Sequence, residues 1–403
     1  MLSGETISII IFFIVLGIII YLNRKKVVTQ KILFPVLYIL MLRTKIGIKL
    51  MDKIAKKAGR QLKYIGYIGV VVGFIGMIVI SFFLMQGIYK ALTKTEHAPS
   101  LGLVGPFKIK GFFYVPFFYW IISLFVLAAV HEFAHGVFTR IYNVRVKSSG
   151  FAFLGIIIPV IPAAYVEPDE KTLAKKSAWK QLSVYSAGPF SNIIMTFLLL
   201  LIFNFLLVPS YMALNERNGI PITEIQENSA FKGTGVSKGD IIHGFDNKEI
   251  VTFSNLSIQI EKYKPGDKVR VSTDKGKYNI VLKENPKNSS VPYMGISLEQ
   301  STKVKDNYAK YASLNPVLIW FTGNWYKLGI YENTGLIGWL IILNFGIGLF
   351  NLVPLGPIDG GRMLKVVLDK FFKEKDNANR IFNSVGIFFL IVIIFLIATS
   401  ILR

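Results

Sequence analysis

The sequence predicts a polytopic α-helical membrane protein of about six transmembrane helices, with a membrane-associated β-hairpin and an extracytoplasmic β-rich domain. Three observations predict this class. Hydrophobic residues make up 52% of the 403 residues, including 32 Phe, which is more than a soluble core requires. Long apolar runs alternate with strongly basic loops, as they do in membrane proteins. A polar stretch with short alternating apolar runs separates the fourth apolar run from the fifth.

Charge and cysteine content limit the chemistry. The formal net charge is +22, but the basic residues cluster in loops between apolar runs, where they orient the chain and contact anionic headgroups. This distribution argues against nucleic acid as a partner. The chain has no cysteine, which excludes disulfides, thiolate ligands and a cysteine nucleophile. Histidine and carboxylate side chains are the metal ligands that remain.

Six apolar runs are predicted to cross the bilayer: residues 6–22, 64–92, 112–142, 182–208, 336–358 and 381–401. The loop 24–63 carries twelve basic residues against one acid, Asp52, which places it in the cytoplasm. Six crossings from that starting point put both termini and the β-rich domain outside the cell membrane. The predicted domains are 1–110 (two helices and a basic loop), 111–208 (first half of a membrane core), 209–300 (β-rich), 301–334 (interfacial) and 335–403 (second half of the core).

Three shorter segments do not fit a simple crossing. Residues 32–42 are apolar but short, so we expect an amphipathic helix lying in the interface. Residues 150–166 are interrupted by Pro159 and Pro162, which predicts an extended hairpin partly embedded in the membrane. This hairpin is either a structural re-entrant segment or a strand that pairs with a guest peptide. Residues 301–334 are aromatic and charged, which favours an interfacial segment, with a seventh span over 316–330 as the alternative.

The β-rich domain contains four predicted strands, at residues 222–225, 241–245, 268–271 and 278–282, separated by turn residues. The run 229–250, followed by the apolar-spaced residues 253–260, resembles a PDZ domain. Such domains bind an extended peptide by adding it as a strand. The resemblance places the start of the groove at four residues: Gly219, Ile220, Pro221 and Ile222.

The third apolar run contains His131-Glu132-Phe133-Ala134-His135. In a helix, His131 and His135 share one face, so both imidazoles can reach one metal ion while Glu132 stands beside it. Ionisable groups are costly in a membrane span and usually mark function. The alternative is an accidental run of these residue types.

A catalytic zinc site usually takes three protein ligands and keeps a fourth position open. The remaining candidates include His97 and His243, which lie on the opposite side of the predicted membrane, and Asp359, which lies on the same side. Pro354 and Pro357 break the helix before Asp359 and let its short side chain turn inward. Local physics also allows Asp359 to be an ordinary turn residue at the interface.

Four features in order resemble the site-2 protease family of intramembrane zinc metalloproteases. They are H-E-x-x-H at 131–135, A-G-P-x-x-N at 187–192, the PDZ-like insert, and N-x-x-P-x-x-P-x-D-G-G at 351–361. The resemblance covers roughly residues 111–403 and implies Zn²⁺ held by His131, His135 and Asp359, with Glu132 as general base. It also implies substrate handling by Asn192 and Asn351, and a hairpin that meets the unwound substrate.

The resemblance implies cleavage of transmembrane segments of membrane proteins, including substrates already cut on the outer side, with the active site toward the cytoplasm. The zinc would acidify its water, and Glu132 would take the proton and pass it to the leaving amine. The PDZ-like domain would gate or recruit substrates. Two alternatives stay open: a prenyl-protein type of membrane zinc protease, and a non-catalytic scaffold with a structural metal and a peptide-binding PDZ-like domain.

Overall fold

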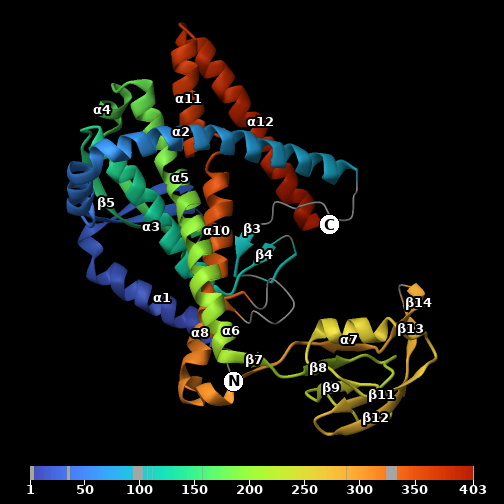
Figure 1. The fold of residues 1–403 in the computed structure, drawn as a ribbon. Coiled ribbons are helices and arrows are strands. Elements are labelled where there is room, and N and C mark those ends of the chain that lie inside the picture. Colours follow the sequence, from blue (N-terminus) through green and yellow to red (C-terminus); the bar gives the residue numbers. More distant parts are fainter. Residues whose placement is uncertain are drawn as a thin grey trace. The chain divides into compact units, whose positions relative to one another are not determined.

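The computed structural model describes residues 4–33, 37–93, 103–106, 108–110, 112–156, 158–286, 288–323 and 334–402. The chain forms two compact units. The first comprises Met1–Leu200 and Trp339–Arg403, and the second comprises Leu201–Gly338 (Figure 1).

Apolar helices dominate the first unit. They are α1 (Gly4–Leu22), α2 (Ile48–Leu92), α3 (Phe117–Ile141), α5 (Ala178–Ile202), α10 (Leu336–Phe350) and α12 (Lys375–Leu402), with the shorter α4 (Glu170–Ala174) and the amphipathic α11 (Asp359–Phe371) between them. Helix α5 continues through a π-helical turn (Phe203–Leu207) into α6 (Val208–Leu214). Among the described residues, four helices are long and apolar enough to cross a membrane, while the apolar stretch Ile9–Leu22 of α1 and all of α10 are shorter.

The predicted fifth span ends earlier in the structure than its hydropathy predicts. The helix ends at Phe350, and residues 351–358 form turns before Asp359 begins α11. Pro354 and Pro357 cannot donate helical hydrogen bonds, so they interrupt the apolar run that hydropathy alone reads as continuous. The third predicted span is also shorter, because Phe112–Tyr114 forms strand β4 beside β3 (Leu103–Gly105). In the opposite direction, α2 begins sixteen residues before the predicted 64, at Ile48.

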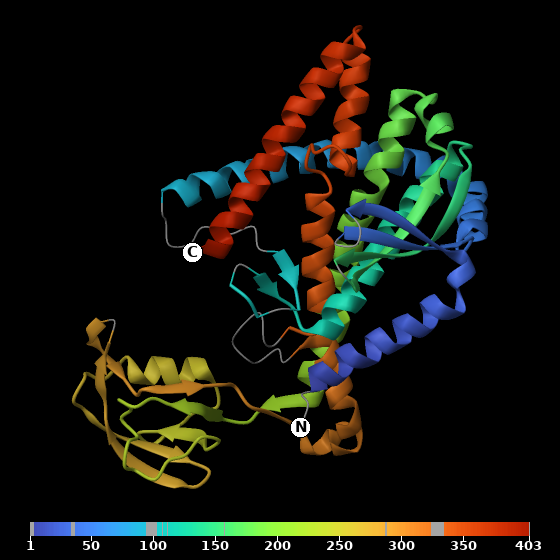
Figure 2. The same ribbon diagram turned by 180° about the vertical axis from the view of Figure 1, so that it is seen from behind.

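A four-stranded antiparallel sheet lies in the same unit, in the order β1 (Val27–Leu33), β2 (Leu37–Thr44), β5 (Val146–Ile156) and β6 (Ile158–Pro168). Strands β5 and β6 confirm the predicted hairpin. The interfacial helix predicted for residues 32–42 is wrong, because its described residues belong to β1 and β2 (Figure 2). An apolar run of that length suits either a strand or a short helix, and β5 offers β2 an edge with which to pair.

Helix α2 packs against the other helices through buried glycines. Gly66 faces Phe138 of α3, Gly69 faces Phe190 of α5, Gly73 faces Met363 of α11, and Gly76 faces Leu352 in the turns before α11. An added Cβ would come within 2.4–3.0 Å of the nearest of these side chains. Small residues permit this close approach of helices, so α2 braces the three segments that carry the candidate site.

The second unit contains a sheet of order β12 (Gly276–Val281), β11 (Lys268–Thr273), β9 (Ile241–Phe245), β8 (Ile220–Ile225) and β15 (Ile296–Leu298), with β10 (Lys248–Glu249) paired to β9. These strands confirm the predicted β-rich domain, and the apolar-spaced residues 253–260 form α7 (Phe253–Ile260). Helix α7 lies along the sheet (Figure 1). Its Leu256 packs into a core that includes Phe231, Phe245 and Val271.

Smaller elements complete this unit. Strand pairs form between β7 (Asn215–Arg217) and β16 (Thr302–Val304), and between β13 (Lys283–Asn285) and β14 (Asn288–Tyr293). The predicted interfacial segment contains a 3-10 helix (Asp306–Leu314) and α8 (Asn315–Thr322). Of the alternative seventh span over 316–330, residues 316–322 lie in α8, and 324–330 fall outside the described residues.

Candidate metal centre

Three side chains that lie far apart in sequence meet in the first unit. His131 and His135 project from one face of α3, and Asp359 is the first residue of α11. Asp359 Oδ2 lies 3.0 Å from His131 Nε2 and 3.2 Å from His135 Nε2. The two Nε2 atoms are 3.1 Å apart. One ligand atom from each residue therefore points at a common volume, and this set of two imidazoles and one carboxylate suits zinc.

The D-G-G sequence explains how Asp359 reaches this position. A Cβ at Gly360 would lie 2.2 Å from the Leu352 carbonyl oxygen, and one at Gly361 would lie 2.3 Å from that of Leu355. Both contacts are with backbone, which cannot move aside as a side chain does. In addition, the Gly360 amide donates to the Asn351 carbonyl over 2.8 Å. The start of α11 is thus held tightly against the preceding turns, and Asp359 with it.

Helix α5 supplies the other wall of the site from one face, where three residues spaced by four follow each other: Val184, Gly188 and Asn192. The Val184 carbonyl accepts a hydrogen bond from His135 Nδ1 over 2.7 Å. A Cβ at Gly188 would lie 2.3 Å from His135 Nε2 and 2.5 Å from His131 Nε2. Gly188 therefore leaves open a cradle beside the nitrogen atoms that would bind metal, and the residues present fit a bound zinc ion.

Glu132 stands apart from the three metal-directed residues. Its Oε2 accepts a hydrogen bond from the Val166 amide of β6 over 2.9 Å. The carboxylate is half-buried and lies next in sequence to His131. Strand β6 packs against α3, so the predicted hairpin positions a side chain of the H-E-x-x-H motif.

The two predicted substrate-handling amides occupy different environments. Asn192 is fully buried, and its amide lies 3.3 Å from His131 Nδ1. Asn351 is half-buried, and its backbone carbonyl holds Gly360. Contact of either side chain with a substrate stays a prediction. The sequence motifs do not mark Val184 and Gly188 as site residues, although their positions eight and four residues before Asn192 place them on the same helix face.

The sequence profile of peptidase family M50 matches residues 119–393. The chain belongs to peptidase family M50, the site-2 protease family. This family M50 peptidase is 27% identical over 364 residues to an uncharacterised protein of Methanocaldococcus jannaschii, covering 86% of this chain and 81% of that protein. It is 22% identical over 281 residues to a protein of Staphylococcus aureus with the provisional name zinc metalloprotease. That alignment covers 59% of this chain and 63% of the staphylococcal protein. Helices α1 and α2 precede the matched region.

Within the second unit, the chain resembles the PDZ domain of an SdrC-like protein from Listeria monocytogenes. The identity is 21%, the TM-score is 0.18, and the match covers 20% of this chain and 86% of that domain. The predicted groove residues Gly219 to Ile222 do not offer a free strand edge. Strand β8 lies between β9 and β15. On the β15 side, the carbonyls of Gly219 and Pro221 accept from Ser301 and Glu299.

The outer strand on that side of the sheet is β15, which comes from the far end of the domain in sequence. Of the other two candidate histidines, His243 is described, and it takes no part in the metal group. His243 lies in β9, with its ring beside Gly219. His97 falls outside the described residues.

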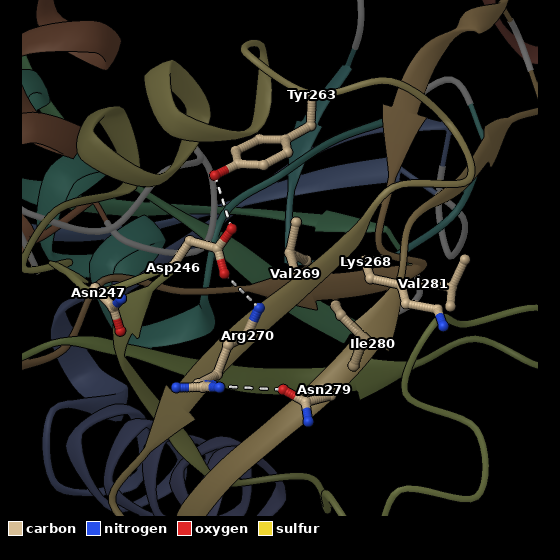
Figure 3. A pocket seen from close by; sticks show the side chains of 9 residues that line it. All are labelled: Asp246, Asn247, Tyr263, Lys268, Val269, Arg270, Asn279, Ile280 and Val281. Atoms are coloured by element: carbon tan, nitrogen blue, oxygen red, sulfur yellow. Dashed lines mark hydrogen bonds between the residues drawn. The ribbon is translucent and has the colours of Figure 1, made fainter.

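A depression of about 610 Å³ in the second unit is a different candidate site (Figure 3). Its one carboxylate, Asp246, accepts from the Tyr263 hydroxyl over 2.8 Å and from the Arg270 amide over 2.7 Å. The hydrogen bond to Asp246 raises the pKa of Tyr263, because it favours the protonated phenol. Both carboxylate oxygens are therefore engaged in holding the turn, which assigns this carboxylate a structural task.

Proposed function

We propose that this family M50 peptidase is an intramembrane zinc metalloprotease that cleaves transmembrane segments of membrane proteins, with Glu132 as general base. One observation carries the proposal. A carboxylate that is not part of the metal group stands beside it, held by a single hydrogen bond from Val166. A structural metal site needs only its ligands, whereas hydrolysis needs an additional group that can accept and return a proton. In the scaffold alternative, Glu132 would only hold β6 against α3, and its second carboxylate oxygen would have no task.

His131, His135 and Asp359 would hold the zinc ion, which supplies Lewis acidity toward water and the scissile carbonyl. The chain's own residues do the rest. The Val166 amide holds Glu132 Oε2, so the other carboxylate oxygen is left to accept a proton from water. The same oxygen then returns the proton to the leaving amine.

Strand β6 is suited to receive the substrate. It is an outer strand of its sheet, and Val166 uses its amide toward Glu132 and away from β5. Because hydrogen-bonding directions alternate along a strand, Ala164 and Pro162 share this outward edge. Pro162 has no amide hydrogen to donate, which is tolerated at an edge. A transmembrane helix must unwind before cleavage, and pairing of its backbone with Ala164 would offset part of the lost helical hydrogen bonds.

The remaining parts of the proposal concern orientation and recognition. The basic loops favour a cell-membrane protein with the active site toward the cytoplasm and the PDZ-like domain outside. There the domain would gate or recruit substrates trimmed by an earlier cut. Asn351, whose side chain has no hydrogen-bond partner among the described residues, is the better of the two amides for substrate contact.

The experiment is cleavage of purified single-span proteins in detergent or liposomes by wild-type enzyme, after zinc removal and after zinc restoration. We expect cuts only with zinc, and mass spectrometry should place them inside the apolar segment. Cuts confined to soluble loops would contradict intramembrane cleavage. Cuts that continue after full zinc removal would contradict the metal chemistry.

A further inference from the structure

We infer that Asn192 is a positioning residue for the metal ligand His131 and that its task is not to contact substrate. The inference rests on the zinc site of the proposed function, but it does not depend on which peptide is cut. Asn192 is 0% exposed, although it lies on the face of α5 that meets the metal group. A side chain that is sealed in this way cannot reach a substrate backbone without opening the helix packing around it.

The first step of the argument is the protonation of the two imidazoles. Both Nε2 atoms point at Asp359 and at each other, so Nε2 is the nitrogen available to a metal. A neutral imidazole that binds metal through Nε2 carries its proton on Nδ1. That proton needs an acceptor, which fixes the ring orientation. For His135 the acceptor is the Val184 carbonyl at 2.7 Å.

The second step identifies the acceptor for His131. The group facing His131 Nδ1 is the Asn192 amide, whose nitrogen lies 3.3 Å away. Its oxygen is buried and has no hydrogen-bond partner in the described part of the chain. A half-turn about the Cβ–Cγ bond exchanges the two atoms within the same volume and brings Oδ1 to the Nδ1 proton. One rotation thus gives the Nδ1 proton an acceptor and Asn192 Oδ1 a donor, and helix α5 then orients both histidines.

The third step is that Asn192 has little freedom to do anything else. A Cβ on Gly348 of α10 would come within 2.9 Å of Asn192 Cβ, so α10 packs directly over this side chain. Thr196 donates to the Asn192 carbonyl one turn later in α5. The amide is therefore held between α3, α5 and α10, and the metal-directed side chain that it faces there is His131.

The test compares zinc binding in full-length variants by competition with a chelator of known affinity. Asn192→Leu removes the acceptor and should weaken zinc binding by about 10–100-fold. Asn192→Asp keeps an acceptor oxygen and should bind zinc at least as tightly as the wild type. Asn344→Leu is the matched control, because Asn344 is another fully buried amide whose nitrogen donates to Leu340 of its own helix. Cobalt in place of zinc gives a second readout, since its visible spectrum should change in Asn192→Leu alone.

Wild-type affinity and cobalt spectrum in Asn192→Leu would overturn the inference, as would an equal loss in Asn192→Asp or in Asn344→Leu. If Asn192→Leu does not fold, Asn192→Asp decides: unchanged or tighter zinc binding supports the inference, and a tenfold loss removes it. The proposed function fails separately. A wild type that binds zinc with this dependence on Asn192, yet cuts no membrane protein, keeps the positioning role and refutes proteolysis.

Discussion

Replacing Gly188 by alanine would place a methyl carbon inside the metal group. The added Cβ would lie 2.3 Å from His135 Nε2 and 2.5 Å from His131 Nε2. Both distances are roughly 1 Å shorter than ordinary van der Waals contact, and neither ring can retreat freely because Val184 and Asn192 hold the Nδ1 sides. The methyl would also occupy space that a zinc ion would need, since zinc binds imidazole nitrogens at ~2.0–2.1 Å in proteins.

Indirect disturbance of a ligand typically costs 10–100-fold in metal affinity, so this direct obstruction should cost at least ~100-fold. Chelator competition and metal analysis of purified protein measure the loss. Gly346→Ala is the matched control, because an added Cβ there meets no atom within 4 Å. It should bind zinc and cleave substrate like the wild type. Zinc affinity within threefold or so of wild type in a folded Gly188→Ala protein would refute this description of the site.

Three further predictions address the surroundings. Val166→Pro removes the amide hydrogen that holds Glu132 without removing a bond to β5, and should lower kcat ~10–100-fold with little change in zinc content. Val166→Ala keeps the amide and should act like the wild type. Equal cleavage rates in Val166→Pro and wild type would contradict the positioning of Glu132. Gly66→Val forces the Phe138 ring aside and should destabilise the first unit by about 1–3 kcal/mol in thermal unfolding; an unchanged midpoint would contradict the close packing of α2. In the second unit, Lys275 and the Ser237 amide donate to the buried carboxylate of Asp240 and lower its pKa below 3.8. The stability that the ionised carboxylate contributes is therefore present above pH 3.8 and is lost as the pH falls through the lowered pKa. Urea unfolding of residues 215–304 measures the free energy of unfolding at each pH. This free energy should fall less on acidification in Asp240→Asn than in the wild type, and an identical fall would count against the ion pair.

The sequence predicted the parts of the site that depend on local geometry or on membrane side. His131 and His135 meet because helical spacing of four places them on one face, whatever the rest of the fold does. Asp359 lies 224 residues after His135 in the sequence. It is nevertheless predictable as a candidate ligand, because the loop charges place both residues at the same depth in the membrane. Its local setting was less predictable, since the residue that was expected to end a span instead begins the amphipathic α11.

What the sequence did not reveal depends on neighbours that are distant in the chain. Gly188 looks like a packing residue until the histidines are placed against it. The run 32–42 has no polar periodicity that separates helix from strand, and only the exposed edge of β5 decides between them. The resemblance to a PDZ domain predicts the start of the groove at residues 219–222, at the beginning of β8. The strand that covers its edge, β15, arrives more than seventy residues later.

In the proposed mechanism, Glu132 moves protons beside a zinc ion that His131, His135 and Asp359 would hold. The most direct test of this mechanism is the cleavage rate of one single-span substrate by Glu132→Gln and wild type, with the zinc content of both proteins measured. Glutamine can still accept from the Val166 amide but cannot take a proton, so we predict equal zinc content and a rate lower by ~10²–10⁴-fold. A Glu132→Gln protein that cleaves the substrate at the wild-type rate would contradict the account.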